Sequence, residues 1–341
     1  MKYIYCPLEH IDSRYTTHLD TDIINYLNEN NIQYIRIYPE IHESSPLKEG
    51  MFLNAPFTIN FKSKQISEIA KLYEDDVIND DDIIFFSDLW HPGIESISYL
   101  NHFCNKKVKI HGIIHAGSWT DTDEVRQLER WAKYFEDVLF DIVDVIYVAS
   151  NFIKQDLIKK RIINENKIKV TPLPLDKNML DKTKGKTKLN NIIFNGRNHP
   201  EKQPELFLEL KNQIESLCKD HFIEIPKFIW TQQNKLTKEE YYKLLLESKI
   251  VVSFALQENF GYGINEAVKL GCTPYVPNRL VYPEHYQQEY LYNNFSDLVD
   301  KIFSHLKNDK KYNVNEIITK SYKQYFLTYN HQSIKTWFNE R

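Results

Sequence analysis

Two glutamates, Glu258 and Glu266, flank a turn between a strand-like run and a helical pattern. Residues 250–256 predict a buried strand that ends at Leu256, and a helix is expected near 262–270. A carboxylate just before such a turn can accept hydrogen bonds from ligand hydroxyls, and one about two turns into the helix can reach a more distant polyol such as a ribose. The alternative is an ordinary strand–turn–helix in which Glu266 is a solvated helix residue.

The turn between these glutamates has the composition of an anion-binding site. N–H groups at the start of a helix attract negative charge, because they point at the ligand and the helix dipole adds to their effect. Gly261 and Gly263 have no side chain and let a phosphate approach the main chain. We therefore expect a phosphorylated ligand to contact the residues of the turn, which are Asn259, Phe260, Gly261, Tyr262 and Gly263.

A glycine and two basic residues follow the first strand of the second half of the chain. Residues 191–196 predict a strand that ends at Gly196, Arg197 comes next, and Lys202 stands just before a helix expected over 203–218. Arginine and lysine at a strand end can clamp a diphosphate through charge-assisted hydrogen bonds. Alone, each could equally be a structural surface residue. Together with the acidic segment further along the chain, they favour a diphosphate site.

The E-x7-E spacing resembles the nucleotide-sugar site of retaining GT-B glycosyltransferases, chiefly the glycosyltransferase family 4 type. In that family the first glutamate contacts the donor sugar and the second contacts the ribose, which implies these roles for Glu258 and Glu266. The family also has a G-R…K motif, which Gly196, Arg197 and Lys202 match. The resemblance thus implies one donor site built from both segments.

Two further stretches resemble the same enzymes. EAVKLGCTPYVPNRLVYPE at 266–284 is similar to tRNA-queuosine mannosyltransferases, and WTQQNKLTKEEYYKLLLESKIVVS at 230–253 resembles the glycosyltransferase family. The second stretch implies that Thr231 and Gln232 lie at a strand end near the nucleobase. Its signal is the weaker one, because any αβ unit could contain a similar stretch.

A histidine and two aspartates follow a strand expected near 108–116. In related enzymes a histidine at the place of His115 lies near the donor sugar and the acceptor; the alternative is a buried, hydrogen-bonded histidine. Asp121 and Asp123 form the DxD pattern that binds Mn²⁺ or Mg²⁺ in the unrelated GT-A fold. Because basic residues and the helix dipole neutralise the diphosphate in a GT-B site, we expect no metal and interpret the aspartates as acceptor contacts or helix N-caps.

Polar and aromatic residues in loops near three predicted strand ends form the candidate acceptor side. Core packing and capping are the alternative roles for these loops. The motifs SRYTTHL, SDLWHPGIE and IHAGSWTDTDE look like those of phage glycosyltransferases for modified nucleobases, and the aromatic members could stack on a base. Beside the two aspartates, the candidates are His10, Arg14, Tyr15, Trp90, His91 and Trp119.

Strand-like runs and helical patterns alternate along the whole chain, which is typical of βαβ units on parallel sheets. The class is therefore α/β, and the resemblance implies two Rossmann-like lobes facing across a cleft, the GT-B architecture. We expect an N-terminal acceptor-side lobe over 1–180 and a nucleotide-sugar-binding lobe over 191–314. The polar stretch 181–190 predicts a linker, and 315–341 predicts a helical segment that packs back on the first lobe.

Composition excludes several classes of protein. The 341 residues have a net charge of -4 and 42% hydrophobic residues, which is ordinary for a globular protein and gives no overall basic field for nucleic acid. Four scattered cysteines, no apolar run of membrane-span length and no secretory signal predict a cytoplasmic protein without a membrane partner, in the host cytoplasm if phage-encoded. The acidic run 74–82 predicts a solvated loop.

These features predict a retaining, metal-independent hexosyl- or pentosyltransferase that uses a UDP- or GDP-linked sugar and no other cofactor. The expected catalytic residues are Glu258, His115, Arg197 and Lys202. The leading acceptor is a hydroxymethyl-pyrimidine in phage DNA, supported by basic stretches over 154–169 and 182–188 that could contact DNA or be solvated faces. A glycan, a tRNA base or a small metabolite is the alternative acceptor, and a non-catalytic nucleotide-sugar binder the alternative function. The sugar and the oligomeric state stay open.

Overall fold

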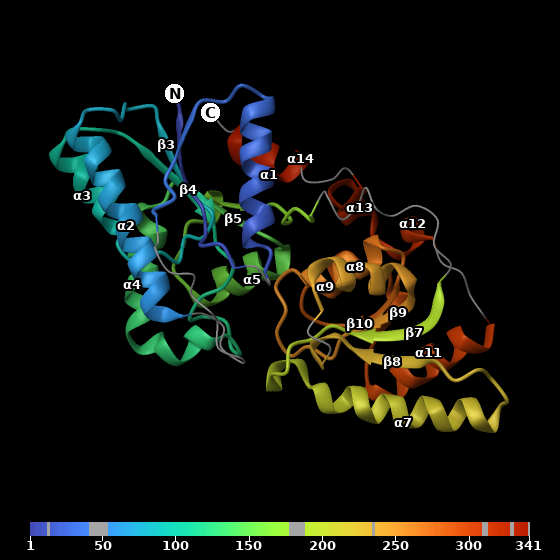
Figure 1. The fold of residues 1–341 in the computed structure, drawn as a ribbon. Helices are drawn as coiled ribbons and strands as arrows, with labels where there is room; N and C mark the ends of the chain where they lie inside the picture. The colour runs from blue at the N-terminus through green and yellow to red at the C-terminus, as the bar shows by residue number, and fades with distance from the viewer. Residues whose placement is uncertain are drawn as a thin grey trace. The chain divides into compact units, whose positions relative to one another are not determined.

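The chain folds into two compact α/β units (Figure 1). Met1–Pro174 and His331–Arg341 form unit 1, and Leu175–Asn330 form unit 2. The structure is a computed structural model that describes residues 1–11, 14–40, 54–176, 188–233, 236–308, 313–327 and 331–339. Of the predicted linker 181–190, residues 181–187 lie outside these ranges.

Unit 1 contains a six-stranded parallel sheet in the order β2-β1-β3-β4-β5-β6. Its central strands are apolar and buried on both faces, as parallel strands covered by helices must be. The strands are β1 Tyr3–Cys6, β2 Tyr34–Arg36, β3 Ile83–Phe86, β4 Lys109–Ile113, β5 Val145–Val148 and β6 Ile168–Val170.

Helices cover both faces of this sheet (Figure 1). Because parallel crossovers are right-handed, the reversal of strand order at β1 puts α1 on one face and α2 to α5 on the other. The helices are α1 Thr16–Glu29, α2 Ala55–Glu74, α3 Glu95–Phe103, α4 Glu129–Ile142 and α5 Asn151–Lys160, with short 3-10 turns η1 Glu124–Leu128 and η2 Glu165–Lys167.

The C-terminal end of the chain returns to unit 1. Helix α14, His331–Phe338, packs beside α1, and the Phe338 ring lies 4.6 Å from the Phe85 ring of β3 and 4.9 Å from the Tyr3 ring of β1. The helical segment expected over 315–341 is divided into three helices, of which α12 Val314–Ile317 and α13 Lys320–Leu327 belong to unit 2.

Unit 2 contains a five-stranded parallel sheet in the order β11-β10-β9-β7-β8. The strands are β7 Leu189–Phe194, β8 Lys227–Trp230, β9 Ser248–Val252, β10 Thr273–Pro277 and β11 Leu291–Tyr292. The helices are α7 Pro204–Asp220, α8 Lys238–Glu247, α9 Tyr262–Lys269, α10 Tyr282–His285 and α11 Phe295–Asn308, with 3-10 turns η3 Pro200–Lys202, η4 Thr231–Gln233 and η5 Gln288–Tyr290. The neighbouring strands β7 and β9 therefore end at the same edge.

Three local features differ from the sequence prediction. Strand β9 ends at Val252, not at Leu256, because the N–H of Leu256 donates to Glu201 O of η3 instead of to a strand. Helix α2 was not predicted, although its Asn54 cap and the proline in its first turn, Pro56, are a helix-start signature. Asp82, placed in a solvated loop, is buried and lies 2.6 Å from Lys2 Nζ.

Among the described residues, no helix has the length and apolar character that a membrane span requires.

Candidate functional site

The loops after β7 and β9 meet at Lys202 and Glu258 in unit 2. Lys202 Nζ donates to Gln257 O at 2.7 Å and lies 3.2 Å from Glu258 Oε2. The other oxygen of Glu258 accepts from the N–H of Gly261 at 2.9 Å. Glu258 is thus held between the lysine and the residue that caps α9, so the two segments that sequence reasoning singled out lie together.

The two glycines shape the start of α9. Gly261, the N-cap, has a φ of +74°, a left-handed conformation that favours glycine. A Cβ at Gly263 would lie 2.6 Å from Asn195 Nδ2 just after β7, so any larger residue there would have to displace the Asn195 amide. The first helical bond runs from Asn265 N to Gly261 O, and the N–H groups before it belong to the helix end that favours anions.

Arg197 lies beside the same loop but is engaged by a carboxylate. Its guanidinium donates to Glu201 Oε1 at 2.5 Å, and Lys202 Nζ lies 3.7 Å from the same atom. The Arg197 side chain is 42% exposed and the Glu201 side chain is 9% exposed. A diphosphate must therefore compete with Glu201 and Glu258 for these cations, a charge balance that the sequence did not suggest.

Glu266 projects from α9 toward two tyrosines of α8. Tyr242 OH donates to Oε1 at 3.1 Å and Tyr241 OH donates to Oε2 at 3.3 Å. Tyr241 OH also accepts from Asn195 Nδ2 at 3.2 Å. Burial raises the pKa of Glu266 to about 7, because the tyrosines and the nearby Lys238 only partly offset the loss of water.

The other predicted donor contacts have mixed placements. Gly196 O accepts from Trp230 Nε1 at 2.9 Å, and Asn259 Oδ1 accepts from Gln257 Nε2 at 2.6 Å. Thr231 is buried in η4, whereas Gln232 beside it is exposed. Phe260 is 3% exposed, and its ring packs against Tyr262 and His285. A ligand can therefore contact its backbone but not its side chain.

At the equivalent edge of unit 1, His115 and Tyr15 lie together. His115 Nε2 lies 2.8 Å from Ser87 O, and Tyr15 OH lies 3.4 Å from His115 Nδ1. Since a carbonyl only accepts, Nε2 carries the proton and Nδ1 accepts from the tyrosine. Burial lowers the pKa of His115, so its ring is neutral near pH 7.

A lysine that sequence reasoning missed completes this edge. Lys62 Nζ of α2 donates to Asp88 Oδ2 at 2.8 Å and to Trp90 O at 2.7 Å. Desolvation raises the pKa of Asp88 but is outweighed by Lys62 and other partners, so the net pKa lies below its usual value. Only an amphipathic reading of 55–74 could have pointed to Lys62.

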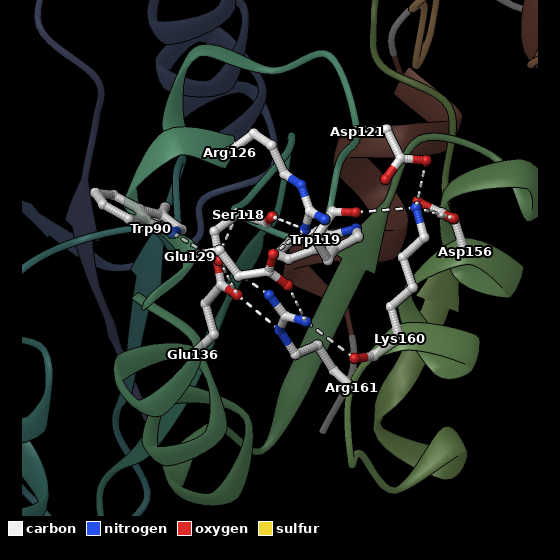
Figure 2. A network of polar contacts seen from close by, with 10 residues as sticks. All are labelled: Trp90, Ser118, Trp119, Asp121, Arg126, Glu129, Glu136, Asp156, Lys160 and Arg161. Carbon is white, nitrogen blue, oxygen red and sulfur yellow. Dashed lines mark hydrogen bonds and ion pairs between the residues drawn. The ribbon is translucent and has the colours of Figure 1, made fainter. Parts of the chain in front are cut away.

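A buried ion pair holds the loops that carry these groups (Figure 2). Glu136 of α4 accepts from Ser118 N at 2.6 Å, from Trp90 Nε1 at 3.0 Å and from Arg161 Nε at 2.8 Å. The side chains of Glu136 and Arg161 are 0% and 2% exposed. This network fastens the loop after β3 to the loop after β4, and sequence reasoning did not identify either member of the pair.

Several predicted acceptor-side residues have structural partners in unit 1. Trp119 and His91 are 1% and 2% exposed, and the interior packing of unit 1 keeps both from reaching an acceptor. Asp123 caps η1 by accepting from Val125 N, which agrees with the N-cap interpretation, and Asp121 pairs with Lys160.

The loop after β1 holds the remaining candidates. His10 Nε2 lies 2.7 Å from Asp20 Oδ2, and Arg14 lies just before α1, with its N–H donating to Ile11 O. Trp90, also a candidate, is half-buried.

The basic stretch over 154–169 is largely engaged within unit 1. Lys154 pairs with Glu165, Lys160 pairs with Asp121 and Asp156, Arg161 pairs with Glu136, and Lys167 donates to Phe140 O and Asp141 O. These contacts weaken the argument for a DNA-binding face. The second basic stretch lies outside the described residues except for Lys188, which donates to Leu245 O and Leu270 O.

Among the described residues, no three His, Cys, Asp or Glu side chains gather in a way that could hold a metal ion.

Comparison with known proteins supports the fold. No family model matches the chain. It is 34% identical over 131 residues to a tRNA-queuosine alpha-mannosyltransferase of Drosophila melanogaster, a match that spans 33% of this chain and 35% of that relative.

Solved structures match over nearly the full length. HepE of Anabaena in complex with UDP has a TM-score of 0.60 at 11% identity, with 98% of this chain and 99% of that chain covered. Sucrose-phosphate synthase of Thermosynechococcus elongatus has a TM-score of 0.62 at 12% identity, covering 98% and 97%. Starch synthase IV of Arabidopsis thaliana, bound to ADP and acarbose, has a TM-score of 0.62 at 10% identity over the whole of both chains. The chain has the GT-B fold, as predicted.

Proposed function

We propose that this protein is a glycosyltransferase that moves a sugar from a nucleotide-diphosphate sugar to a hydroxyl group. The observation that carries the proposal is the contact of Lys202 with Glu258 at the start of α9, with Glu266 further along the same helix. A cation and a helix start suit a diphosphate, and two carboxylates suit the hydroxyls of a sugar and a ribose.

Structural neighbours with bound nucleotides support the choice of donor. HepE was crystallised with UDP and with UDP and glucose, and the starch synthase domain with ADP. We propose a UDP- or GDP-linked sugar as the donor, with Thr231 and Gln232 near the base and Glu266 on the ribose.

The proposed reaction breaks the bond between the anomeric carbon and the diphosphate oxygen. Negative charge then grows on the leaving phosphate, where Lys202, Arg197 and the N–H groups of the first turn of α9 stabilise it. The acceptor oxygen attacks from the same face and its proton passes to the departing phosphate, which retains the anomeric configuration. Glu258 orients the sugar and no metal takes part. In unit 1, His115 with Tyr15 are the candidate groups for hydrogen bonds to the acceptor.

The acceptor that we propose is a hydroxyl on a modified nucleobase. The phage-like motifs of unit 1 favour a hydroxymethyl-pyrimidine in DNA. The specific observation that favours a tRNA base instead is the 34% identity to a tRNA-queuosine mannosyltransferase. Because Lys154, Lys160 and Arg161 are paired within the protein, we expect either acceptor to be recognised mainly through its base.

One experiment tests both donor and acceptor. The protein is incubated with UDP- and GDP-sugars and with hydroxymethylated DNA or queuosine-containing tRNA, in EDTA and in Mg²⁺, and the nucleosides are analysed by mass spectrometry and NMR. The expected product is a glycosylated nucleoside with the donor's anomeric configuration in both buffers. Donor binding without transfer to either nucleic acid would overturn the nucleobase acceptor, and failure of every nucleotide sugar to bind or react would overturn the glycosyltransferase.

A further inference from the structure

Helix α4 exposes a row of large apolar side chains on its outer face. Trp131 is 53% exposed, Tyr134 is 70% exposed and Val138 is 49% exposed. Their spacing of three and four residues puts them in one stripe along the helix. The opposite face already packs on the sheet through Ala132, Glu136, Leu139 and Phe140. Apart from the edge of Trp131, whose ring lies 6.3 Å from the Trp90 ring, most of the stripe faces away from unit 1.

The neighbouring helix carries the same kind of surface. Helix α3 contacts α4 on the same face of the sheet (Figure 1) and exposes Tyr99 and Phe103, at 65% and 68%. In contrast, the longer helices α2 and α7 each expose a single large apolar residue among those described, Ile59 and Leu208. Several large apolar side chains gathered on one surface are typical of an interface, whereas single ones are ordinary.

Charged side chains flank the stripe, and their sign changes from positive to negative along the helix. The 3.6-residue period places Arg130, Lys133, Asp137 and Asp141 along one side of it, with the basic pair in the first half of the helix and the acidic pair in the second. Arg130, Lys133 and Asp141 are exposed, and none of their side chains forms a hydrogen bond or ion pair with another described residue.

We propose that this face binds a second copy of the same chain, with the two α4 helices antiparallel about a two-fold axis. Such an axis lies in the interface and brings the same flank of both helices together in opposite directions. Arg130 then faces Asp141 of the partner subunit, and Trp131 packs on the partner's Val138. In a parallel two-fold arrangement the charged flanks of the two helices would lie on opposite sides of the interface and could not pair, so the charge order favours the antiparallel dimer.

Sedimentation velocity of the full chain over a range of concentrations tests the proposal. The wild type should sediment as a dimer at micromolar concentrations. The variants Arg130→Glu/Lys133→Glu and Asp141→Lys, whose sites are solvent-exposed, should each raise the dimer dissociation constant by about tenfold or more, because each variant opposes like charges twice across the axis. Circular dichroism checks their folding, and a substitution at the exposed Lys307 of α11, Lys307→Glu, is the control that should leave the dimer intact.

A mixture of the two variants is the decisive arm. One variant has an acidic flank and the other a basic one, so an equimolar mixture should form a heterodimer. Trp131→Ala/Tyr134→Ala should dissociate the dimer without a rescuing partner. A monomeric wild type, charge variants that dimerise like the control, or a mixture of folded variants that stays monomeric would each overturn the proposal, and in the first case a different partner protein would be the occupant to seek.

Discussion

The strand-end edges of the two units differ in chemistry although both belong to parallel sheets flanked by helices. In unit 2 the edge carries Lys202, Arg197 and the start of α9, which together suit an anion. In unit 1 the edge carries the neutral pair of His115 and Tyr15 and the balanced pair of Lys62 and Asp88. The same architecture thus supports two kinds of recognition, because the loops and not the sheet determine the chemistry.

The two edges also differ in how they are held. Unit 2 relies on glycine, since Gly261 needs a left-handed conformation and Gly263 meets Asn195 closely. Unit 1 relies on buried charge, since Glu136 and Arg161 fasten its loops. We therefore expect substitutions at the edge of unit 1 mainly to lower the free energy of unfolding. Substitutions at the edge of unit 2 should mainly lower catalytic activity.

The largest effect is expected from Arg161→Met in unit 1. Removing this arginine leaves Glu136 buried without its cation, which costs about 3–5 kcal/mol. Urea unfolding of the free protein measures the loss. The control is Lys159→Met, a neighbouring helix substitution outside the network, and a stability of Arg161→Met within about 1 kcal/mol of this control would contradict a structural role for the buried pair.

Lys202→Ala in unit 2 should mainly affect turnover. The lysine stabilises the leaving phosphate in the proposed reaction, and loss of one such donor costs about 2.7–4 kcal/mol, or roughly 10²–10³ in kcat. Steady-state kinetics at saturating donor measure the effect, with Lys211→Ala on α7 as the matched control. Turnover within about twofold of the control, a difference below 0.5 kcal/mol, would remove Lys202 from the catalytic site.

Tyr242→Phe should weaken donor binding and change its pH dependence. Ionised Glu266 accepts ribose hydroxyls in our proposal, so wild-type donor affinity should rise with pH through about 7. Losing the hydroxyl of Tyr242 costs about 1 kcal/mol and moves this rise to higher pH, because the hydrogen bond stabilises the carboxylate. Calorimetric titration of donor at several pH values measures both; an unchanged midpoint would separate Glu266 from ribose binding.

The same carboxyl makes an opposite prediction for stability. The pKa of Glu266 rises from 4.5 in the unfolded chain to about 7 in the folded protein, so the folded state holds this proton more tightly. Its contribution to stability is therefore present below pH 4.5 and is lost as the pH rises to about 7. Comparing wild type with Glu266→Gln by urea unfolding at pH 5 and pH 7.5 isolates this term, and a difference of the opposite sign would contradict the raised pKa.

The smallest effect is expected from Tyr15→Phe in unit 1. The hydroxyl donates to His115 Nδ1 over a long 3.4 Å. Its loss should therefore lower kcat/KM for the acceptor by an amount equivalent to about 0.5–1.5 kcal/mol and should leave the donor affinity unchanged. Kinetics with the acceptor varied, together with donor titration, measure the two separately. A loss of donor affinity with unchanged kinetics for the acceptor would contradict the assignment of Tyr15 to the acceptor.

The strand-end edge of unit 2 was largely predictable from the sequence, whereas that of unit 1 was not. Gly196, Arg197, Lys202 and Glu258 lie in the loops that follow strands β7 and β9, and a strand end in a parallel sheet is a fixed place. Trp119 and His91 were less predictable, because an aromatic or imidazole side chain after a strand can point into the interior as readily as out of it. Lys62 was missed because it lies on α2, a helix that the sequence analysis did not predict.

The alternation of apolar runs with helical patterns was enough to establish an α/β chain with two similar halves. Buried parallel strands require short apolar runs, and these runs recur along the sequence between the helices. No such sequence pattern identifies the partner of an individual charged side chain. Only the fold decided that Glu201 shares Arg197 and Lys202, that two tyrosines hold Glu266, and that Arg161 is buried on Glu136 instead of facing solvent. Charge pairing depends on distances between residues far apart in the chain, and these distances exist only once the helices have packed.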